Sequence, residues 1–98
     1  MGRFFSSLLV SLMILIQLNC VQNKKVTIAV IPKGTTHIFW KSIHAGAQKA
    51  ADSLNIDIIW QGPQKEDDRE MQINVVQNFI SRGVSAMVLA PLDEVALV

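Results

Sequence analysis

The chain has 98 residues, of which half are hydrophobic, and its formal net charge at pH 7 is +1. This balance excludes an extended basic surface for nucleic acid and a long acidic tail. Cys20 is the single cysteine, so an intrachain disulfide is excluded as well.

Residues 1–19 have the pattern of a secretory signal peptide. Arg3 gives a short basic start, and an apolar run diluted by serines extends from Phe4 to Ile16. The run is shorter than the roughly 20 residues that a membrane-spanning helix needs. We therefore favour a signal peptide over the alternative, a membrane anchor helix.

Cys20 ends the segment LIQLNC, which resembles the lipobox of bacterial lipoproteins. In that signal the cysteine is diacylated and becomes the mature N-terminus. Asn19 and Gln17 depart from the small and aliphatic residues that are usual at these two positions. We expect a lipid anchor on Cys20 and a tether over residues 20–25. The alternative is an unlipidated thiol near an ordinary cleavage site.

Residues 26–98 contain three short apolar segments that alternate with two helical patterns. The predicted elements are a strand at 26–31, a helix at 39–55, a strand at 56–60, a helix at 66–82 and a strand at 84–90. The first strand is apolar on both faces apart from Thr27, as is typical of a buried parallel strand. This alternation predicts an α/β fold with a parallel sheet and right-handed crossovers.

Each predicted helix carries one apolar stripe. The stripe consists of Phe39, Ile43, Ala47, Ala50 and Leu54 in the first helix, and of Met71, Val75, Val76, Phe79 and Ile80 in the second. Gly46 and the alanines around it predict close packing of the first helix against the sheet. Asp67 and Glu70 have the spacing of a capping box, and Gly83 is a helix C-terminal signal.

The polar turn after the first strand is the candidate binding site, because open α/β sheets bind ligands at the carboxyl ends of their strands. The turn carries Lys33, Thr36 and His37, and the helix opens with Phe39 and Trp40. An aromatic wall beside hydrogen-bonding groups suits a small polyol such as a sugar. The alternative is that the two aromatic residues only fasten the helix to the sheet.

Three pieces of sequence, in this order and at these spacings, point to a known family. They are TIAVI with its polar turn and the Phe39–Trp40 pair, then GAQKAA, then RGV followed by LAPLD. Together they make residues 25–98 resemble the N-terminal lobe of the ribose/galactose type of periplasmic sugar-binding protein, which serves ABC importers. The resemblance implies a three-layer, doubly wound, Rossmann-like lobe of a type I periplasmic binding protein. Residues 26–98 would form an incomplete β-α-β-α-β part of it.

The resemblance also implies roles for individual residues. Phe39 and Trp40 match the aromatic pair that contacts the sugar ring, and Asp93 falls in a second turn that borders the cleft. Lys33 and His37 occupy turn positions of polar ligand contacts. With Thr36 they replace the serine and asparagine often seen in this turn, which leaves the identity of the sugar open.

We therefore expect an exported, lipid-anchored protein of the periplasm or cell envelope that captures a small carbohydrate for the permease of an ABC importer. Catalysis, a cofactor and nucleic acid are not expected. A metal site is not expected either, because nothing completes a ligand set around His37 and His44, and we interpret His44 as a solvated surface residue.

Other functions and other origins of the chain stay open alternatives. The same module could feed a signalling partner as a sugar sensor, or the chain could be an α/β enzyme. A transcription repressor shares this lobe, but the signal segment occupies the place of its DNA-binding helices. Residues 94–98 read as the start of a helix without an end signal. We interpret the chain as a piece of a larger protein, either a fragment or a truncated product with little binding activity.

Overall fold

The computed structural model describes residues 24–98, so the expected signal peptide and the lipidation site Cys20 lie outside the described residues. The elements, in chain order, are β1 (Thr27–Ile31), α2 (Ile38–Leu54), β2 (Asp57–Trp60), α3 (Arg69–Arg82) and β3 (Ala86–Leu89). The predicted alternation of strands and helices is thus confirmed, although α3 begins three residues later than expected. Across the described range, no helix has both the length and the apolar character needed to cross a membrane.

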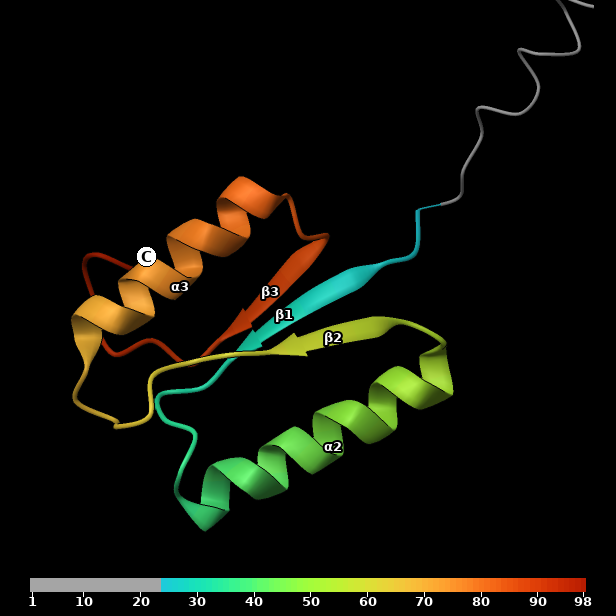
Figure 1. The fold of residues 1–98 in the computed structure, drawn as a ribbon, viewed down its shortest axis with the longest axis horizontal. Coiled ribbons are helices and arrows are strands. Elements are labelled where there is room, and N and C mark those ends of the chain that lie inside the picture. The colour runs from blue at the N-terminus through green and yellow to red at the C-terminus, as the bar shows by residue number, and fades with distance from the viewer. Residues whose placement is uncertain (1–23) are drawn as a thin grey trace, which may run out of the picture.

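The three strands form one parallel sheet in the order β2-β1-β3. The central strand β1 pairs Ile28 with Ile58 of β2 on one side and with Ala86 of β3 on the other. The two crossovers run in opposite directions across the sheet, so right-handed connections put the helices on opposite faces. Figure 1 shows the sheet between α2 and α3. The predicted three-layer, doubly wound α/β architecture is confirmed.

The main hydrophobic core lies between the sheet and α3. It consists of Ala29 and Ile31 of β1 with Val75, Val76 and Phe79 of α3. The predicted stripe of α3 is wrong at its two flanks, because Met71 and Ile80 are exposed. The buried face begins instead at Gln72, a polar residue that fits the helical spacing of the core positions.

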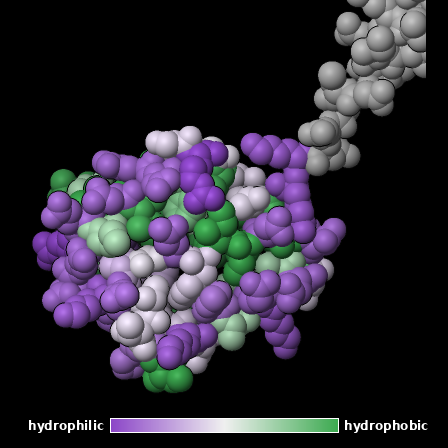
Figure 2. Space-filling view, in the orientation of Figure 1, coloured by the Kyte–Doolittle hydropathy of each residue, from purple (hydrophilic) through white to green (hydrophobic). Residues whose placement is uncertain are grey.

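The contact face of α2 lies about one residue away from the predicted stripe. Trp40 and Ala51 are the buried residues of this helix, whereas Phe39, Ile43 and Leu54 are exposed. Consecutive residues of a helix point about 100° apart, so a shift of one position moves the whole stripe onto the flank. Figure 2 shows one face of the molecule, on which hydrophobic residues lie at the surface between hydrophilic ones.

Two further expectations about α2 are wrong. The His44 ring is not solvated on all sides, since it stacks on the Trp60 ring of β2 with centroids 4.5 Å apart and planes 5° apart. Gly46 does not mark a close approach to the sheet, because a Cβ placed there would have no atom within 4 Å. An aromatic pair therefore joins this part of the helix to β2.

The helix ends follow ordinary capping chemistry. The Asp68 side chain accepts a hydrogen bond from the Met71 N–H at 3.1 Å and caps α3. The predicted capping box that begins at Asp67 is therefore wrong by one residue. With Asp68 as the N-cap, the N3 position of the helix is occupied by Met71 and not by Glu70. Gly83 ends α3 in the left-handed region at φ 68°, as predicted.

Substitution of two glycines by alanine tests the close approach of the loops that follow β1 and β2. A Cβ on Gly62 would lie 2.9 Å from the Pro32 carbonyl oxygen. Gly62→Ala should therefore lower the free energy of unfolding by about 1–3 kcal/mol, the usual effect of overpacking. Gly46→Ala is the matched control and should raise it by about 0.5–1 kcal/mol, because alanine favours an open helical position. If urea denaturation showed that both substitutions change the free energy of unfolding in the same direction, this packing would be contradicted.

Candidate functional site

The candidate site lies where the chain leaves the neighbouring strands β1 and β3 in different directions. After β1 the chain passes through residues 32–37 into α2 on one face of the sheet. After β3 it passes through residues 90–93 toward the other face, where Leu97 packs against the α3 core. Such a divergence is a topological switch point, the place at which doubly wound sheets bind ligands outside the carboxyl ends of their strands.

The turn after β1 is fixed against the loop after β2. The Thr36 hydroxyl donates a hydrogen bond to the Gln64 carbonyl oxygen at 3.0 Å. The Trp40 indole N–H donates to the Glu66 carboxylate at 2.6 Å. A Cβ on Gly34 would lie 2.9 Å from Cγ of Glu66, so the two loops are in close contact. The turn that carries the candidate residues is therefore held by neighbouring backbone and side chains.

Gln72 joins the turns that follow β1 and β3, and sequence analysis missed it. Its side chain is fully buried. The amide nitrogen donates to the carbonyl oxygens of Pro32 at 3.0 Å and Ala90 at 2.9 Å. The amide oxygen accepts from the Leu92 N–H at 2.8 Å. The signal available in the sequence was its spacing of three, four and seven residues from the core positions of α3.

The aromatic pair at the start of α2 is divided between surface and interior. The Phe39 side chain is 56% exposed, whereas Trp40 is only 8% exposed. Their rings pack in a T-shaped arrangement with centroids 5.0 Å apart. Phe39 thus presents an accessible aromatic ring at the edge of the sheet. Trp40 supports that ring and ties the helix to Glu66, which matches the fastening role considered as the alternative.

The structure gives the polar residues of the first turn different environments. Lys33 is partly buried, and no neighbouring side chain in the described residues bonds its ammonium group. His37 caps α2, because its Nδ1 accepts a hydrogen bond from the Phe39 N–H at 3.1 Å. Thr36 and His37 both use a side-chain hydrogen bond to hold the turn, whereas Lys33 is the candidate residue of this turn without such a bond.

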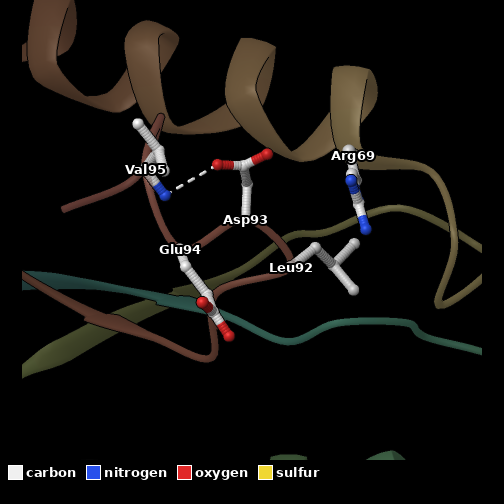
Figure 3. Close-up of a pocket in the computed structure, with 5 residues that line it drawn as sticks. All are labelled: Arg69, Leu92, Asp93, Glu94 and Val95. Atoms are coloured by element: carbon white, nitrogen blue, oxygen red, sulfur yellow. Dashed lines mark hydrogen bonds between the residues drawn. The ribbon is translucent and has the colours of Figure 1, made fainter.

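Asp93 lies in the second turn, beside a shallow pocket of about 280 Å³. Its carboxylate accepts hydrogen bonds from the N–H groups of Ala96 at 2.7 Å and Val95 at 2.8 Å. These bonds, aided by the positive charge of Arg69, lower the pKa of Asp93 below its ordinary value. Figure 3 shows Asp93 directed toward Val95, with Arg69 on another side of the pocket.

Arg69 is a site residue that sequence analysis did not identify. It opens α3, and it lines the pocket together with Leu92, Asp93, Glu94 and Val95. Its place at the start of a helix after β2 puts it at the same edge of the sheet, which was the available signal. The edge therefore offers an aromatic ring, an ammonium group, a guanidinium group and a carboxylate. Residues 24–98 contain no cluster of three or more His, Cys, Asp or Glu side chains suited to a metal ion.

Comparison with known proteins identifies the family. Residues 28–98 match the model of the periplasmic binding protein domain, and the chain belongs to this family. It is 31% identical over 77 residues to the D-ribose/D-allose-binding protein of Pseudomonas aeruginosa, a match that covers 76% of this chain and 24% of that protein. The family resemblance drawn from the sequence is confirmed.

Solved structures agree with this assignment. A carbohydrate transporter solute-binding protein from Agrobacterium radiobacter, in complex with D-arabinose, matches with a TM-score of 0.70 and 33% identity, over 74% of this chain and 24% of that one. An ABC transporter solute-binding protein from Actinobacillus succinogenes, with bound D-allose, matches with a TM-score of 0.67 and 33% identity, over 70% and 24% of the two chains. The chain thus spans about a quarter of the length of these relatives.

Proposed function

We propose that this chain is part of an exported solute-binding protein that captures a small carbohydrate and delivers it to an ABC-type importer. The observation that carries the proposal is the exposed Phe39 ring beside polar groups at the switch point between β1 and β3. Relatives of the same family are described as bound to D-allose and to D-arabinose. A ring face with a few hydrogen-bonding groups around it is the chemistry that such sugars require.

Each proposed binding residue has a distinct part in this function. Phe39 would contact the apolar face of the sugar ring, and Trp40 would add its remaining exposed edge and hold Phe39 in place. Lys33 would donate hydrogen bonds to sugar hydroxyls, and Asp93 would accept them. Thr36 and His37 would act mainly by fixing the turn that carries Lys33 and Phe39.

The loops of the site are held before any ligand arrives. The hydrogen bonds from Thr36 to Gln64 and from Trp40 to Glu66 restrict the first turn, and the bonds of Asp93 restrict the second. A preorganised site loses less conformational entropy on binding than a flexible one. We infer that this edge forms one wall of the sugar cleft, and that the second lobe expected from the resemblance forms the other.

Substitutions at the exposed ring and the lysine test the proposed site in the complete protein with its second lobe. Phe39→Ala should weaken sugar binding by about 1–3 kcal/mol, because an aromatic contact surface is lost. Lys33→Met should weaken it by about 1–3 kcal/mol, since a sugar hydroxyl would lose its partner. Titration calorimetry with a panel of pentoses and hexoses measures both effects.

Trp60→Phe is the control for this series. Trp60 stacks on His44 and lies outside the proposed contact set, so its substitution should lower the melting temperature more than the affinity. If Phe39→Ala lowered only the melting temperature and left the affinity unchanged, the ring would have a purely structural role and the proposed site would be wrong.

We also propose that Cys20 carries a lipid anchor and that the protein resides in the periplasm or cell envelope. The apolar run that ends at LIQLNC supports this proposal. Expression in a bacterial host with labelled palmitate should label the protein, and Cys20→Ser should remove the label. Label that persists in the Cys20→Ser variant would overturn the lipid assignment.

A further inference from the structure

The Gln72 side chain connects segments of the chain that are distant in sequence. Its three hydrogen bonds reach Pro32, Ala90 and Leu92, which are 40, 18 and 20 residues away. All three partners are backbone atoms, two in the turn after β3 and one in the turn after β1. No sugar can touch this side chain directly, because it is fully buried.

Gln72 acts at the point where the pairing of β1 with β3 ends. The last backbone hydrogen bond between the two segments runs from the Ala90 N–H to the Ile31 carbonyl at 3.0 Å. Pro32 follows, and beyond it the two segments share no further backbone hydrogen bond in the described part of the chain. The Gln72 amide then bridges the Pro32 and Ala90 carbonyls, and its oxygen takes the Leu92 N–H. The side chain therefore continues the link between the two segments beyond the last backbone hydrogen bond.

The amide group matches its three partners in number and in chemical kind. Two N–H donors meet two carbonyl oxygens, and one carbonyl oxygen meets one N–H. A glutamate would still offer an acceptor to Leu92 but would place an oxygen against the two carbonyls. A leucine has similar size and would leave all three backbone groups without a partner, which is costly in a buried position.

We propose that Gln72 is a positioning residue of the sugar site. It sets the separation between the turn that carries Lys33 and Phe39 and the turn that carries Asp93. The inference rests on the proposed function, because the two turns matter together only if they contact the same ligand. Sugar affinity would then depend on a side chain that lies beneath the site and never contacts the sugar.

The test compares Gln72→Leu with a core variant that should lower the melting temperature by a similar amount. Val75→Ala is the matched control, since Val75 is buried in the α3 core one turn further along the helix. Both variants are made in the complete protein with its second lobe and are titrated with D-ribose and D-allose at a temperature where each is fully folded. Gln72→Leu should raise the Kd roughly tenfold or more. Val75→Ala should leave it within about twofold, even with a comparable fall in melting temperature.

Amide hydrogen exchange without sugar gives a second and independent measurement. The Leu92 N–H should exchange faster in Gln72→Leu than in Val75→Ala when both are compared at equal global stability. A wild-type Kd in Gln72→Leu would overturn the positioning role. If the complete wild-type protein with its second lobe bound no sugar, the proposed function would fail. Unchanged protection of the Leu92 N–H in Gln72→Leu would separately overturn the coupling of the two turns.

Discussion

One fully buried amide, that of Gln72, links the carboxyl ends of β1 and β3. Gln72 belongs to the same helical face as Val75 and Phe79, so the packing of α3 on the sheet also fixes the position of the amide. The amide in turn fixes the backbone of Pro32 and Leu92 through its hydrogen bonds. The packing of α3 on the sheet thus places the amide that holds the two surface turns next to each other.

A second set of contacts orients the start of α2 from the other side of the sheet. Trp40 is buried and bonded to Glu66, and His37 caps the helix through the Phe39 N–H. These contacts leave the Phe39 ring as the accessible aromatic surface at this edge. The residues that fasten the helix therefore also present the ring. The structure gives Trp40 a fastening role, and the proposed contact with a sugar falls to Phe39.

The order of the elements and the family could be predicted from the sequence because they rest on local patterns. Apolar runs of strand length, a proline after β1 and a glycine after α3 are each visible in a short window. The phase of α2 was less visible, because its many small residues tolerate either face and its two aromatic residues are adjacent. Only the tertiary structure shows that Trp40 points inward and Phe39 outward.

The role of Gln72 could not be predicted because its partners come from two other segments of the chain. A polar residue on a helix is ordinarily expected at the surface, and its burial requires that the surrounding groups satisfy it. Those groups are backbone atoms of turns whose proximity follows from the strand order β2-β1-β3. The alternation of elements predicted a parallel sheet but left this order open, so it left the pairing of the two turns open as well.

The central claim is that the edge formed by these two turns contacts a sugar. The most direct test is the titration of the ¹⁵N-labelled complete protein, second lobe included, with D-allose while amide chemical shifts are recorded. The account predicts shift changes concentrated in residues 33–39 and 90–94, with little change at Val26 and Ser85 at the opposite edge of the sheet. Saturable changes centred on that opposite edge, with none in the two turns, would contradict it.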